Sequence, residues 1–236
     1  MIPIRDSQRS QSIPIISILI ICVCSYIFAF TLTLSPEDIP GFLNRYGLIP
    51  SKFFHSSYLS HSGVAGMPGS VLLTTLFLHG SLLHILANMW SLWIFGDNVE
   101  DRFGHIGFFI FYFFCGIVAS LTHVWFQSES PMPTVGASGA IAGVMGAYLT
   151  MFPRAKILVL IPLLLWPLYV EVPAVLFVGL WAYTQVMQGL NTLQDPTLPF
   201  QGGVAWWAHV GGFLCGILLT PVFKYLSKSF SVLCGT

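Results

Sequence analysis

The feature that most constrains this chain is its shortage of charge: only nine Lys or Arg and nine Asp or Glu residues occur among 236. A soluble domain of this length carries about 59 charged residues, roughly a quarter of the chain. Hydrophobic residues instead make up 55% of the sequence, and its mean hydropathy is +0.79. So few charges cannot cover a water-facing surface, which excludes a soluble globular protein, a disordered chain and a nucleic-acid-binding protein. The sequence therefore predicts an all-α protein that crosses a lipid bilayer several times.

Six apolar segments are candidates for transmembrane helices, each of which needs about 20 residues to cross about 30 Å of hydrocarbon. We interpret the first as a retained anchor because it is long and lacks a small-residue cleavage site. A long membrane-associated loop, residues 35–79, separates it from the second helix. The predicted helices span about 13–34, 81–96, 105–126, 137–152, 171–187 and 204–223.

The apolar stretch 157–170 is harder to place because it contains Pro162 and Pro167. We interpret it as irregular chain embedded in the membrane. A helix is then expected to start at Glu171, with Pro173 in its first turn, where proline is tolerated. At a helix N-terminus the Glu171 carboxylate interacts favourably with the helix dipole. Its alternative role, as the proton-relay residue of a small transporter, is disfavoured because the sequence shows no internal repeat.

Basic residues set the expected orientation, because cytoplasmic loops carry an excess of Lys and Arg. With six helices, most of them fall on the side that holds both termini: Arg5, Arg9, Arg102, Arg154, Lys156, Lys224 and Lys228, against Arg45 and Lys52 on the other side. Residues 1–12 are then a short cytoplasmic N-terminus, 13–223 the membrane domain and 224–236 a cytoplasmic tail. Without an Arg-rich transit segment in this sequence, we expect the location to be a bacterial cytoplasmic membrane.

Polar residues inside the apolar segments are informative because each is costly in lipid unless it is paired or functional. Three clusters occur: His84 with Asn88, Ser138 within Gly-Ala-Ser-Gly, and His209 within Ala-His-Val-Gly-Gly. Each lies within about two turns of the outer end of its predicted helix, so all three share one depth. His84 and Asn88 are four residues apart and therefore share a helix face.

Glycine spacing indicates which helices pack together. Gly139 and Gly143 on the fourth helix, and Gly212 and Gly216 on the sixth, have the small-xxx-small spacing of close helix pairs in membranes. Such packing would bring the Ser138 hydroxyl within reach of His209, a base that can take its proton. The predicted spans offer no carboxylate to orient His209 from the same depth. The expected unit is therefore a Ser–His dyad.

Acyl transfer also requires hydrogen-bond donors for the developing oxyanion. The Ser138 backbone N–H lies near a helix start, where N–H groups are unpaired. The His84 ring and the Asn88 amide can add side-chain donors. For each residue taken alone, a structural role in helix packing is the alternative; the three clusters together favour catalysis.

These motifs resemble those of the rhomboid intramembrane serine proteases, over roughly residues 35–223. The resemblance rests on His84-Ile85-Leu86-Ala87-Asn88, Gly136-Ala137-Ser138-Gly139 and Ala208-His209-Val210-Gly211-Gly212, with Glu100-Asp101-Arg102-Phe103-Gly104 similar to an inner-loop motif. It implies a six-helix rhomboid-type bundle that hydrolyses peptide bonds in or near the transmembrane segments of protein substrates. Ser138 is then the nucleophile, His209 the general base, and His84 and Asn88 oxyanion donors, with Gly136, Gly139, Gly143, Gly212 and Gly216 packing helices at the site.

The resemblance implies no metal or cofactor, and the spacing of the Cys and His residues fits no zinc motif. His55, His61, His105 and His123 are expected to be solvated. The sequence departs from some bacterial members at Ala142, where they carry a tyrosine that stacks on the catalytic histidine. A catalytically silent relative that binds membrane clients is the competing hypothesis, although both dyad residues are present.

Overall fold

The structure, a computed structural model, describes residues 2–64, 67, 69–163, 166–194 and 203–234, and is mostly helical. In chain order its elements are β1 (Ile2–Asp6), α1 (Ile15–Thr31), α2 (Asp38–Tyr46), η1 (Pro50–Lys52), α3 (Ser56–His61), α4 (Val71–Thr74), η2 (Thr75–Phe77), α5 (Leu82–Phe103), α6 (His105–Phe126), α7 (Ser138–Met151), β2 (Lys156–Pro162), β3 (Pro167–Pro173), α8 (Ala174–Gln194) and α9 (Trp206–Cys234). The predicted connection 188–203 lies partly outside the described residues, as do residues 235 and 236 of the predicted tail.

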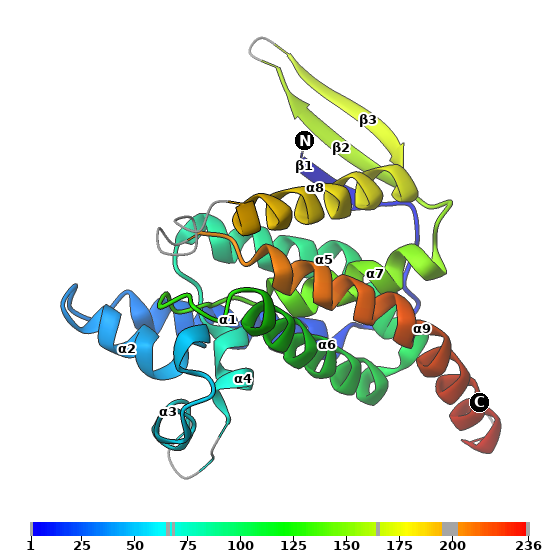
Figure 1. Ribbon diagram of the computed structural model, residues 1–236. Coiled ribbons are helices and arrows are strands. Elements are labelled where there is room, and N and C mark those ends of the chain that lie inside the picture. Colours follow the sequence, from blue (N-terminus) through cyan, green and yellow to red (C-terminus); the bar gives the residue numbers. More distant parts are fainter. Residues whose placement is uncertain (1, 65–66, 68, 164–165, 195–202, 235–236) are drawn as a thin grey trace.

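Helices α5 to α9 form a bundle in which α7 packs against both α6 and α9 (Figure 1). The helix α7 is buried along most of its length, because its many Gly and Ala residues let the neighbouring helices approach closely. The largest fully buried side chains are aromatic and come from α5, α6 and α7: Tyr112, Tyr148, Phe95, Phe108 and Phe111. The core therefore lies around α7, which begins at Ser138.

The outer surface of the bundle is apolar, as expected of a protein in lipid. Ile106 and Trp125 on α6 are each about four-fifths exposed, and Trp93 on α5 is 55% exposed. Within the described residues, α6 and the Trp206–Ser227 part of α9 are long and apolar enough to cross a membrane. The bent pair of Val71–Phe77 and Leu82–Phe103 adds a third candidate. The prediction of a mostly helical membrane protein is confirmed in this form, and the number six remains a prediction.

A three-stranded antiparallel sheet departs from the all-α prediction. The strand order is β1-β2-β3, and the sheet stands out from the bundle beside α8 (Figure 1). The predicted N-terminal segment 1–12 thus contributes a strand, pairing Ile2 with Leu160 and Asp6 with Ile157. The predicted loop 35–79 contains the short helices between α1 and α5, with α2 and α4 in contact.

The interpretation of 157–170 as irregular embedded chain is wrong, because this stretch forms most of the β2–β3 hairpin. Antiparallel pairing satisfies the backbone N–H and C=O groups that irregular chain would leave without partners. The helix predicted from Glu171 is wrong at its start as well: α8 begins at Ala174, immediately after Pro173.

Glu171 therefore lies in a strand, where it pairs across the hairpin with Lys156 at 2.8 Å. This ion pair lowers the pKa of Glu171 and raises that of Lys156. Both side chains are well exposed, so the pair contributes little to stability. The exposed position also removes the reason for considering Glu171 an intramembrane proton relay.

The start of α1 is held by a carboxylate from the end of α5. Glu100 is completely buried and accepts hydrogen bonds from the backbone N–H groups of Ile16 and Ser17, at 2.8 and 2.9 Å. It also accepts from Ser17 Oγ and lies 2.7 Å from His105 Nδ1. A negative charge at a helix N-terminus satisfies orphan N–H groups and complements the dipole. Glu100 thereby joins α1 to the bundle.

We expect Glu100→Ala to lower the free energy of unfolding by about 3 kcal/mol, because it leaves several buried donors without an acceptor. The measurement is reversible unfolding in mixed micelles. The matched control is Glu171→Ala, which removes an exposed carboxylate and should leave the unfolding midpoint unchanged. Equal midpoints for the two variants would contradict the anchoring role of Glu100.

Candidate active site

The loop before α7 turns the chain so that Ser138 opens the helix. Gly136 has φ +128°, in a region that L side chains rarely adopt, and its N–H donates to Thr75 O at 3.0 Å. A Cβ at this position would lie 2.7 Å from His84 Nε2. Glycine is therefore required both by the backbone conformation and by the close approach of α5. Ser138 is the first residue of α7, where backbone N–H groups lack intrahelical partners.

The helix α9 meets α7 at the two predicted glycine pairs. A Cβ on Gly212 would overlap the carbonyl oxygen of Gly139, and a Cβ on Gly216 would overlap that of Gly143. His209, one turn before Gly212, is 7% exposed. Its Nε2 lies 2.8 Å from Ser138 Oγ, a normal hydrogen-bond length. The structure thus brings together the two side chains that the sequence singled out.

The other imidazole nitrogen has a partner that sequence reasoning missed. His209 Nδ1 lies 2.7 Å from Oε1 of Gln185, a residue of α8 that is 5% exposed. The Trp181 ring, one turn earlier on α8, lies 5.8 Å from the His209 ring at an interplanar angle of 35°. The signal in the sequence is an amide side chain within an apolar helix, which can orient an imidazole as a carboxylate does.

His84 and Asn88 extend from α5 toward the same place. Their side chains lie beside Gly136, where a Cβ would be 2.7 Å from His84 Nε2 and 3.6 Å from Asn88 Nδ2. Asn88 is 6% exposed, and its Nδ2 has no hydrogen-bond partner among the described residues. A buried amide donor without a partner costs about 1–3 kcal/mol, unless a bound group accepts from it. The arrangement therefore leaves one donor free to face an incoming oxygen.

A cavity of about 1180 Å³ lies between α5, α6, α7, α8 and α9, and the four polar side chains singled out by the sequence line it. Its lining includes Ser138, His209, His84, Asn88 and Trp181, and continues to Gln127 at the end of α6. A hydroxyl bonded to an imidazole in such a cavity can act as a nucleophile, because the base takes its proton as it attacks. The cavity thus provides the components that acyl transfer requires.

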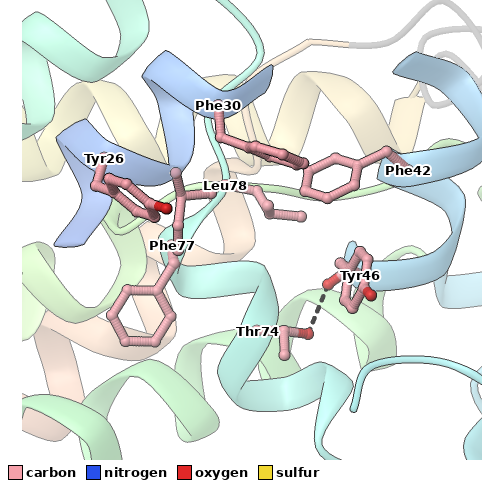
Figure 2. A pocket seen from close by; sticks show the side chains of 8 residues that line it. Tyr26, Phe30, Phe42, Tyr46, Thr74, Phe77 and Leu78 are labelled. Carbon is pink, nitrogen blue, oxygen red and sulfur yellow. Dashed lines mark hydrogen bonds between the residues drawn. The ribbon is translucent and has the colours of Figure 1, made fainter. Parts of the chain in front are cut away.

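A second, smaller cavity of about 280 Å³ lies between α1, α2 and the α4–η2 segment (Figure 2). Aromatic side chains surround it, among them Tyr26, Phe30, Phe42 and Phe77. Its Thr74 hydroxyl donates to the backbone oxygen of Tyr46 at 2.7 Å. Its apolar lining distinguishes it from the large cavity, where Ser138 Oγ and His209 Nε2 meet.

One of the histidines expected to be solvated is not: His123 lies on the buried face of α6 and is 9% exposed. His105 contacts Glu100, but its side chain remains 41% exposed, and His55 and His61 are exposed as expected. Helix periodicity places His123 inside, although the sequence position near a connection suggested otherwise. Among the residues that the structure describes, no group of three or more His, Cys, Asp or Glu side chains could hold a metal ion.

Comparison with known proteins matches residues 69–226 to the family model of the Rhomboid domain. Rhomboid protein 1, mitochondrial, of Saccharomyces cerevisiae is 30% identical over 192 residues, which cover 80% of this chain and 47% of that protein. RHOMBOID-like protein 5 of Arabidopsis thaliana is 30% identical over 67% of this chain and 47% of its own length. Rhomboid protease GluP of Bacillus subtilis is 41% identical over 78 residues, 33% of this chain and 15% of that protein. The chain thus spans about half the length of the first two relatives.

Proposed function

Because this chain belongs to the rhomboid family, we propose that it is a serine endopeptidase that cuts membrane proteins in or near their transmembrane segments. Rhomboid proteins include intramembrane proteases, and one relative is named a rhomboid protease. The observation that carries the proposal is the 2.8 Å contact between Ser138 Oγ and His209 Nε2 in the large cavity.

In the proposed reaction, Ser138 Oγ attacks the carbonyl carbon of the scissile peptide bond while His209 Nε2 takes the hydroxyl proton. The carbonyl oxygen becomes an oxyanion, which accepts hydrogen bonds from Asn88 Nδ2, the His84 ring and the Ser138 backbone N–H. The protonated His209 then gives its proton to the leaving amine, and the C–N bond breaks. Water, activated by the same histidine, releases the acyl group and restores the serine.

Two features support the oxyanion roles. Asn88 Nδ2 is a buried donor without a partner in the described part of the chain, so an oxyanion would satisfy it. Ser138 begins α7, where the dipole and the unpaired N–H groups favour negative charge. The developing charge would then form where donors are already in place, which is how enzymes lower such barriers.

We propose further that residues 13–223 form one membrane domain of six helices, flanked by residues 1–12 and 224–236 on one side of the bilayer. The apolar outer faces of α5 and α6 and the asymmetry of Lys and Arg support this arrangement. The substrates are membrane proteins whose extended chain can enter the large cavity. Neither a metal ion nor a cofactor is part of the proposed reaction.

The test is cleavage of a membrane-anchored model substrate by the purified protein in proteoliposomes, with fluorophosphonate labelling in parallel. We expect cleavage and labelling of one serine, identified as Ser138 by peptide mass spectrometry. A protein that captures the substrate without cutting it, and that resists the fluorophosphonate, would instead be a catalytically silent relative.

A further inference from the structure

His209 is held at both ring nitrogens, by residues of two different helices. Its Nε2 faces Ser138 Oγ on α7 at 2.8 Å, and its Nδ1 faces Gln185 Oε1 on α8 at 2.7 Å. Both distances are typical of direct hydrogen bonds. The Gln185 contact involves two side chains that are at most 7% exposed, so water competes little with it.

The hydrogen bonds of Gln185 fix which end of its amide faces the histidine. Its Nε2 donates to the backbone oxygen of Trp181 and to Thr184 Oγ1, both at 3.0 Å. Thr184 Oγ1 in turn donates to the same Trp181 oxygen at 2.6 Å. Because an amide oxygen cannot donate, exchanging the two ends of the amide would break the bond to the Trp181 oxygen and set two acceptors against each other. The amide oxygen must therefore face His209.

An amide oxygen only accepts hydrogen bonds, so the nitrogen opposite it must carry the proton. His209 is thus the tautomer with its proton on Nδ1, and its Nε2 lone pair is free to accept from Ser138 Oγ. That is the tautomer a general base needs, since the wrong one cannot take the serine proton. The Trp181 ring beside His209 also limits rotation of the imidazole.

We propose that Gln185 is the positioning residue for His209, an inference that rests on the proposed protease function. Gln185 holds the imidazole in the competent tautomer and orientation, and its carbonyl dipole stabilises the imidazolium formed when Ser138 is deprotonated. A neutral amide on α8 thus acts where a triad would have a carboxylate. The position of α8 then affects catalysis directly, because a shift of this helix would move the acceptor from His209.

The test compares Gln185→Leu and Gln185→Glu with Gln194→Leu, an exposed glutamine at the end of the same helix. We expect Gln185→Leu to lower kcat about 10- to 100-fold with little change in KM. Effects of this size are typical when a residue that orients a functional side chain is removed. Gln185→Glu restores an acceptor and should recover most of that activity. The Gln194→Leu variant should cleave at the wild-type rate.

The pH profile and NMR separate positioning from a structural role. A carboxylate favours the protonated imidazole more than an amide does, so the acidic limb for Gln185→Glu should move up by about one pH unit. His84 on α5 and His123 on α6 also interact electrostatically with His209, and both are present in every variant compared. Imidazole ¹⁵N shifts, assigned with His209→Gln, should report the Nδ1–H tautomer in the wild type and its partial loss in Gln185→Leu.

The outcomes distinguish this inference from the proposed function. Wild-type cleavage with an equally active Gln185→Leu would overturn the positioning role and leave the protease. If the wild type never cleaves, but Gln185→Leu still reduces the population of the Nδ1–H tautomer, the protease function is overturned and the contact between Gln185 and His209 stands. If Gln185→Leu does not fold, an unshifted pH profile in Gln185→Glu overturns the inference.

Discussion

Ser138→Ala is expected to abolish cleavage of a membrane-anchored substrate, with a loss of roughly 10⁴-fold or more. The variant retains the backbone N–H at the start of α7 but has no oxygen with which to attack the peptide carbonyl. His209→Ala should lose a similar amount, because the hydroxyl then has no base 2.8 Å away to take its proton. The measurement is the initial rate of product formation in proteoliposomes.

Serine and histidine are expected to act as a unit, so the double variant should be no slower than either single variant. Ser60→Ala is a suitable control, because that exposed hydroxyl on α3 bonds only within its own turn. Cleavage that persists in Ser138→Ala would exclude this residue as the nucleophile. Fluorophosphonate labelling distinguishes loss of the nucleophile from loss of the base. The His209→Ala variant retains Ser138 but should react with the reagent far more slowly than the wild type.

The features that the sequence predicted well are those determined by local composition and spacing. The shortage of charge required an apolar environment, and the polar residues within apolar segments marked Ser138, His209, His84 and Asn88. In the structure these four side chains line one cavity. The spacing of Gly212 and Gly216 indicated a close helix pair, and each lies against a glycine carbonyl of α7.

Gln185 could not be singled out in the same way. A glutamine in a membrane helix usually indicates a hydrogen bond, but its partner is 24 positions away on another helix. Predicting the bond requires the rotation of α8 about its axis, which depends on how α8 packs against α9 and α7. The sequence predicted a dyad because the predicted spans offer no carboxylate to orient His209, whereas the structure places a neutral acceptor, Gln185 Oε1, at its Nδ1.

The sheet was missed for a related reason. Residues 157–170 are apolar throughout, and a continuous apolar run fits a strand or a buried helix equally well. The pairing that decides the question is long-range: β2 lies between β3 and β1, and Ile157 is opposite Asp6. Asp6 is in turn bonded to Tyr148 Oη and Asn98 Nδ2, and burial raises the pKa of its carboxyl group. These tertiary contacts are absent from any local pattern.

Gly216→Ala is expected to lower the free energy of unfolding by about 3 kcal/mol, because the added methyl group would overlap the carbonyl oxygen of Gly143. Backbone atoms cannot rotate away as a flexible side chain can, so α7 and α9 must separate. The measurement is reversible unfolding in mixed micelles. Gly179→Ala on α8 is the matched control, since a Cβ there has no neighbour within 4 Å and alanine favours a helix.

The same substitution tests how the active site is assembled. His209 and Gly216 lie on one helix, and Ser138 and Gly143 on its neighbour, so separating the helices at the glycines lengthens the contact between Ser138 and His209. We therefore expect the folded fraction of Gly216→Ala to cleave more slowly than the wild type, whereas Gly179→Ala retains its rate. A variant that is less stable but fully active once folded would show that other contacts hold the nucleophile against its base.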